Sequence, residues 1–233
     1  MRLLALDTAS GQCSAALLID GQLLLREQAT AREHARLILP MVQSLLAEAG
    51  CTLGSLQAIA FGRGPGSFTG VRIAASVTQG LAFAADLPVL PVSDLRALAL
   101  QAAGLETTAG LSLLACMDAR MHEVYWSLHP PAENGAVADA PEQVTAPSVL
   151  LQFLVEQAHS GAQCLAAGCG LAAYFGDDLA FGVPVQRQLP RAEPHAREIA
   201  RLALADYAAG LALPAEAAIP VYVRDQVVQT PRT

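Results

Sequence analysis

The feature that most constrains the fold is a pattern that occurs twice along the chain. Apolar residues 3–6 end at Asp7 and are followed by a second apolar segment at 15–19, and residues 111–117 end at Asp118 and are followed by a segment at 123–128. Segments with helical periodicity follow each pair. Strands and then helices, found twice, are typical of an α/β protein with two similar halves. We therefore predict an α/β fold with a first half at 1–104 and a second half at 105–233, whose closing segment could return to the first half.

The individual elements follow from local patterns. Asp20 and Gly21 separate two short apolar runs and predict a hairpin turn, so the chain should open with antiparallel strands near 3–6, 15–19 and 23–25. Periodicity predicts helices at 32–49 and 69–85, a third beginning after the N-cap candidate Ser93, and strands at 56–61 and 89–92. In the second half it predicts helices at 148–157 and 195–209, a strand at 164–167, and a loop across the Pro-rich residues 130–147.

Composition excludes several classes of protein. Hydrophobic residues make up 53% of the chain and charged residues 15%, which predicts a folded core. The uncharged runs are too short, or too often interrupted by polar residues, to span a bilayer, and Asp7 lies where a signal peptide would be apolar, so we expect a cytoplasmic protein without a membrane contact. The chain has no lysine, which excludes a Walker phosphate loop and Schiff-base chemistry. Its net charge of −7 opposes direct binding of a polyanion such as tRNA.

A glycine-rich segment at 62–70 joins a predicted strand to a predicted helix. Free N–H groups at a helix N-terminus favour anions, so one interpretation is a phosphate or nucleotide site, now vestigial. The other is a tight turn that lets the helix pack on the sheet. The spacing matches neither the dinucleotide fingerprint nor a nucleophile elbow. The candidate phosphate-site residues are Asp7, Gly64, Gly66, Ser67, Thr69, Gly70 and Asp118; strand-end caps are the alternative for the two aspartates.

No set of residues in the sequence predicts catalysis or a metal site. The histidines form no pair at the i, i+4 spacing of a helical metal site, and no Ser/His/Asp or Cys/His set is recognisable. The five cysteines are scattered through apolar segments without a zinc-type spacing, which favours buried free thiols. We therefore predict no catalytic residue and no metal ligand.

Several motifs resemble those of the TsaB family. They are GRGPGSFTGVRI at 62–73, LLALDTASGQCSAALL at 3–18, HARLILPMVQSLL at 34–46, MDARMHEVYW at 117–126 and PVYVRDQV at 220–227. The resemblance covers nearly the whole chain. It implies the actin-like ATPase fold of two duplicated α/β halves, the second one reduced. Such proteins are sometimes labelled M22 glycoproteases, although this sequence supplies no peptidase nucleophile or metal site.

The resemblance also implies a function. TsaB is a shortened relative of TsaD, the subunit that transfers a threonylcarbamoyl group to N6 of adenosine 37 in tRNAs that read ANN codons. TsaD holds its metal with two histidines, and the corresponding residues 92–97 contain none. The implied role is a non-catalytic scaffold that binds TsaD and TsaE, pairs with itself when alone, and meets tRNA only through the complex. No cofactor is expected, and nucleotide binding at the complex stays open. A nucleotide-binding ATPase or phosphotransferase of the same fold, or a tRNA-binding module, are the alternatives.

In that family the first two long helices form the partner surface. The apolar positions of the helix at 32–49 span an arc of roughly 160°, wider than one core contact needs. This width and the small residues of the next helix suit a contact between two subunits. We predict that a partner is contacted by His34, Ile38, Met41, Val42, Leu45, Val71, Ala74, Ala75 and Thr78. The alternative is that these side chains belong to the core of the chain itself.

Overall fold

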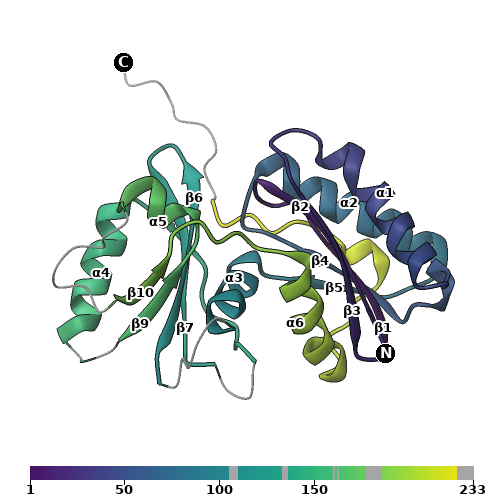
Figure 1. Cartoon of the computed structure of the whole chain (residues 1–233). Coiled ribbons are helices and arrows are strands. Elements are labelled where there is room, and N and C mark those ends of the chain that lie inside the picture. Colours follow the sequence, from purple (N-terminus) through teal and green to yellow (C-terminus); the bar gives the residue numbers. More distant parts are fainter. Residues whose placement is uncertain (105–109, 133–135, 160, 162, 177–184, 225–233) are drawn as a thin grey trace.

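The structure is a computed structural model that describes residues 1–104, 110–132, 136–159, 161, 163–176 and 185–224. Two five-stranded sheets stand side by side, with helices on their outer faces and between them (Figure 1). The boundary that the sequence predicts after residue 104 meets residues 105–109, which lie outside the described residues.

Sheet A holds the strands of the first half. They are β1 (Arg2–Asp7), β2 (Gln12–Ile19), β3 (Gln22–Ala29), β4 (Ala58–Gly62) and β5 (Val89–Val92), in the order β3-β2-β1-β4-β5. The first three are antiparallel, and β4 and β5 run parallel to β1. The predicted hairpin turn is confirmed, because Asp20 and Gly21 both have positive φ, 48° and 87°.

Sheet B repeats this arrangement. Its strands are β6 (Ser112–Arg120), β7 (Glu123–His129), β8 (Gln143–Thr145), β9 (Cys164–Ala167) and β10 (Val185–Leu189), in the order β10-β9-β6-β7-β8. The antiparallel and parallel pairs match those of sheet A one for one. The predicted duplication and actin-like fold are therefore confirmed. The predicted loop at 130–147 is wrong at β8, a strand of three residues that is too short to show a period.

The helices form three layers around the two sheets. The pair α1 (His34–Glu48) and α2 (Phe68–Ala85) covers the outer face of sheet A, and α4 (Pro147–His159) with α5 (Cys169–Tyr174) covers that of sheet B. Between the sheets lie α3 (Asp94–Ala103) and α6 (Ala196–Ala208) (Figure 1). Two short 3-10 turns are η1 (Leu53–Ser55) and η2 (Ala215–Ala217). The predicted N-cap is confirmed, since the Ser93 hydroxyl accepts from the Arg96 N–H at 3.1 Å.

The end of the chain returns to the first half. Helix α6 packs against β1, β2, β4 and β5, although it follows the last strand of sheet B. Beyond it, Val89 and Leu213 exchange two backbone hydrogen bonds of 2.7 and 2.9 Å, and the Val221 N–H donates to the Arg63 carbonyl at 2.8 Å. None of the described helices is both long and apolar enough to cross a membrane.

Candidate functional site

The glycine-rich segment packs against the turn between β1 and β2. A side chain at Gly70 would clash with the Thr8 carbonyl, and one at Gly66 with the Ala9 carbonyl. The Thr8 hydroxyl donates to the Gly70 carbonyl at 2.6 Å, and the Ser67 N–H donates to the Ala9 carbonyl at 2.7 Å. Glycine is needed at these two positions because the backbone of the glycine-rich segment approaches the backbone of the β1–β2 turn closely, which fits the tight-turn interpretation. Thr69 is exposed.

Two fully buried carboxyl groups lie beside this segment. Asp7 Oδ1 accepts from the Ala9 N–H at 2.8 Å, and Asp94 Oδ2 accepts from the Gly64 N–H at 2.6 Å. Both carboxyls crowd the space where a side chain on Gly62 would lie. Among the described residues, no donor reaches the second oxygen of either group, Asp7 Oδ2 or Asp94 Oδ1.

The burial of this pair changes its chemistry. Burial raises the pKa of Asp7 to about 7. Burial, and then the charge of Asp7, raise the pKa of Asp94 well above its usual range. The pair therefore keeps at least one proton at neutral pH, and that proton can join the two carboxyls. Since both side chains are 0% exposed, the pair fastens the glycine-rich segment to sheet A and has no surface for a substrate.

Asp118, the counterpart of Asp7 at the end of β6, belongs to a separate cluster. Its carboxylate accepts from the Tyr174 hydroxyl at 2.9 Å and from the Arg120 backbone and guanidinium at 2.8 Å each. Within the described part of the chain, no hydrogen bond or ion pair joins it to Asp7. No described group of three His, Cys, Asp or Glu side chains could hold a metal ion either.

The predicted partner residues lie in the core of this chain. Eight of them are buried; they are His34, Ile38, Val42, Leu45, Val71, Ala74, Ala75 and Thr78. Met41 is half-buried. They face sheet A because a helix that covers a sheet turns its most apolar stripe inward. Their burial in the single chain does not fit the prediction that they contact a partner.

The outward side of the same two helices carries large exposed apolar side chains. Phe83 is 81% exposed, Phe68 54% and Leu39 43%. A shallow groove of about 380 Å³ runs between the start of α1 and α2. We call this surface the helical face; its residues are Ala35, Leu39, Phe68, Arg72, Ile73, Ser76, Val77 and Phe83. The α2 members recur at helical spacing, so they share one side of that helix.

An aromatic and cationic cluster marks one edge of the helical face. The Arg72 guanidinium carbon lies 3.5 Å from the centroid of the Phe68 ring, and Arg72 Nε donates to the Tyr222 hydroxyl at 2.7 Å. The Phe68 and Tyr222 centroids are 6.1 Å apart. Tyr and Arg are enriched where proteins bind one another. Our sequence reasoning missed this face because it followed the small residues of α2; a phenylalanine in an otherwise small-residue helix was the available signal.

Comparison with known proteins identifies the family. A family model described as "TsaD: tRNA N6-adenosine threonylcarbamoyltransferase" matches residues 27–230. The "tRNA threonylcarbamoyladenosine biosynthesis protein TsaB" of Escherichia coli is 40% identical over 228 residues, which cover 97% of this chain and 96% of that protein. The chain belongs to the TsaB family.

Two further relatives agree with this assignment. The TsaB of Haemophilus influenzae is 50% identical over 127 residues, which are 54% of this chain and 53% of that protein. The crystal structure of a Pseudomonas aeruginosa protein "with similarity to peptidase YEAZ" superposes with a TM-score of 0.84 at 41% identity, covering 96% of this chain and 99% of that one. The TsaB-like fold thus extends over both sheets.

Proposed function

We propose that this chain is a non-catalytic subunit in the biosynthesis of threonylcarbamoyladenosine on tRNA. It binds TsaD, with TsaE joining the assembly, and TsaD performs the transfer to N6 of adenosine 37. The observation that carries the proposal is the helical face, because an outward-facing apolar and aromatic surface on two packed helices is what a stable partner contact requires.

The exposure of the helical face supports its role in binding. Phe83 leaves 81% of its surface in water in the free chain, and Phe68 leaves 54%. Transferring such rings into an interface gains roughly 25 cal/mol for every Å² of apolar surface removed from water. The same surface offers a contact between two copies of this chain when no other partner is present, which we also propose.

The glycine-rich segment supports a role without catalysis. Thr8 and Ala9, in the turn between β1 and β2, pack directly against the glycine-rich segment. The carboxyl of Asp7 is buried against Asp94. An ATPase or phosphotransferase with its site at this segment would need the β1–β2 turn and the Asp7 carboxyl to be open to a ligand. With a net charge of −7, the chain would meet tRNA through its partners.

Binding of TsaD by variants of the helical face tests the proposal. Phe83→Asp places a charge where an apolar contact is expected and should weaken binding by at least about thirtyfold, since central aromatic residues contribute roughly 2 kcal/mol or more. The matched control is Val149→Asp on α4, a residue that is 50% exposed on the other half. Isothermal calorimetry measures both. Equal binding by Phe83→Asp and the parent chain would remove the helical face from the proposal.

A further inference from the structure

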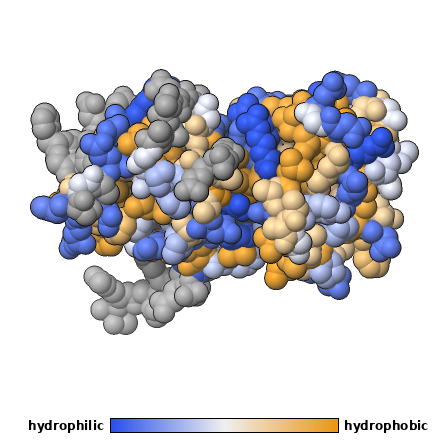
Figure 2. All heavy atoms as spheres, turned by 90° about the horizontal axis from the view of Figure 1, so that it is seen from below, coloured by the Kyte–Doolittle hydropathy of each residue, from blue (hydrophilic) through white to orange (hydrophobic). Residues whose placement is uncertain are grey.

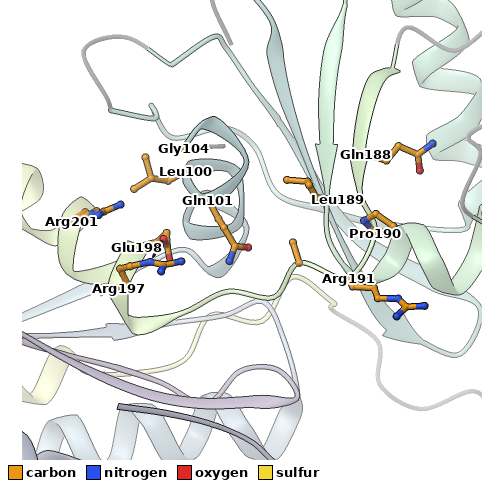
Figure 3. Close-up of a pocket in the computed structure, with 11 residues that line it drawn as sticks. Leu100, Gln101, Gly104, Gln188, Leu189, Pro190, Arg191, Arg197, Glu198 and Arg201 are labelled. Carbon is orange, nitrogen blue, oxygen red and sulfur yellow. Dashed lines mark hydrogen bonds and ion pairs between the residues drawn. The ribbon is translucent and has the colours of Figure 1, made fainter. Parts of the chain in front are cut away.

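A pocket of about 580 Å³ opens between the two halves, away from the glycine-rich segment and from the helical face. Its walls come from α3, from β10 with the residues that follow it, and from α6 (Figure 3). Seen from below, hydrophilic side chains gather between the two halves (Figure 2). The pocket belongs to no function that is assigned above.

Three lining side chains, Gln101, Gln188 and Glu198, each have a buried oxygen that accepts no hydrogen bond from a described residue. Glu198 is only 2% exposed; its Oε1 accepts from Arg197 Nε at 2.7 Å, and its Oε2 has no hydrogen-bond partner among the described residues. Gln101 Oε1, across the pocket on α3, is also buried and has no hydrogen-bond partner in the part of the chain that the structure describes. Burying a carboxylate oxygen away from water carries a desolvation penalty in free energy, and without a hydrogen-bond donor nothing offsets this penalty. These oxygens could accept hydrogen bonds from a ligand that carries N–H donors. A cationic amine forms the stronger, charge-assisted hydrogen bond with a carboxylate.

The mouth of the pocket carries the opposite charge. Arg201 lies one turn after Glu198 on α6, is exposed, and makes no ion pair with any described residue. Its head and the Arg197–Glu198 pair lie on one side of the opening and Gln101 on another (Figure 3). A guanidinium in this position suits a carboxylate. Leu100 and Leu189 supply apolar wall between these polar groups.

We propose that this pocket binds a free α-amino acid. The ammonium group pairs with Glu198 Oε2 and Gln101 Oε1, the carboxylate pairs with Arg201, and the side chain of the ligand lies against Leu100 and Leu189. The ligand must carry both charges, because an amine alone leaves Arg201 unpaired and a carboxylate alone leaves the oxygen of Glu198 without a donor.

The test is binding by the purified full chain, and it does not depend on TsaD. Each of the twenty standard L-amino acids is titrated to roughly 10 mM in a thermal-shift screen, and the tightest is measured by calorimetry. The decarboxylated and the deaminated analogue of that amino acid are then measured beside it. We expect one or more amino acids to bind and both analogues to bind at least about tenfold more weakly.

Variants connect this binding to the pocket. Arg201→Gln removes the carboxylate partner at an exposed position and should weaken binding about fivefold or more. Arg32→Gln is the matched control, because Arg32 is also exposed and does not line the pocket. Glu198→Gln should weaken binding at least about thirtyfold, with its melting temperature showing that the chain stays folded. If no amino acid binds, if an analogue binds as well as its parent, or if Arg201→Gln leaves binding unchanged, the proposal is overturned. None of these results would bear on TsaD binding.

Discussion

The buried carboxyl pair should make the stability of the chain fall as the pH rises from 4 to 7. Burial raises the pKa of Asp7 from 3.8 to about 7. Between these values the folded chain holds a proton that the unfolded chain releases. The unfolded state is therefore favoured progressively as the pH rises, and the part of the stability that Asp7 contributes is lost above pH 7. Three pKa units at 1.36 kcal/mol each give roughly 4 kcal/mol.

Replacing Asp7 with asparagine should remove the part of this pH dependence that Asp7 contributes, while the burial of Asp94 remains. The asparagine side chain keeps an oxygen for the Ala9 N–H, and its amide can donate to Asp94 as the shared proton does. The free energy of unfolding of Asp7→Asn should therefore exceed that of the parent chain by an amount that grows by roughly 4 kcal/mol between pH 4 and pH 7. Removal of the Asp7 charge also lowers the pKa of Asp94, which acts in the same direction.

Urea unfolding at several pH values, followed by far-ultraviolet circular dichroism, measures the difference directly. The control is Asp86→Asn, at an exposed residue whose positive φ of 53° an asparagine adopts readily. The reasoning is refuted if the curves of Asp7→Asn and the parent chain stay parallel from pH 4 to pH 7. It is equally refuted if Asp86→Asn changes the slope as much as Asp7→Asn does.

Three further predictions test the packing of the fold. Leu45→Ala removes a side chain that is 0% exposed and should lower the free energy of unfolding by about 2–5 kcal/mol, whereas Leu39→Ala on the exposed side of the same helix should change it by less than about 1 kcal/mol; urea unfolding compares them. Gly70→Ala should prevent the chain from accumulating in folded form, because the new methyl group meets the Thr8 carbonyl; a folded Gly70→Ala with an unchanged melting temperature would contradict the packing described. Arg96→Ala should lower the free energy of unfolding by about 3–5 kcal/mol, because it leaves the half-buried Asp206 without its 3.0 Å ion pair between α3 and α6. Thermal unfolding measures this loss.

The sequence predicts the fold better than the surfaces. The repeated strand that ends in an aspartate is a local pattern, and it led to the duplicated halves that the sheet orders confirm. Ser93 was recognisable as an N-cap because capping depends on neighbouring residues alone. The strand β8 was missed because its three residues pair with β7 through contacts that no local pattern records.

The binding surfaces depend on which side of each helix faces the core and which side faces outward. An apolar stripe shows that a helix buries one side, but it does not distinguish the core of the chain from a partner. Val71 and Ala74 therefore looked like partner residues, whereas Phe68 and Phe83 lie outward. Likewise, Gln101 and Glu198 are far apart in sequence, and only the packing of α3 beside α6 brings them into one pocket.

The central claim, that the chain serves TsaD as a partner without chemistry of its own, is tested most directly by forming threonylcarbamoyladenosine on tRNA in a purified system. The reaction contains tRNA, TsaD, TsaE and a threonylcarbamoyl donor, with this chain, with its Phe83→Asp variant, or with neither. We predict product with the parent chain, and little or none with the variant or without the chain. Equal product in the absence of the chain would contradict the claim.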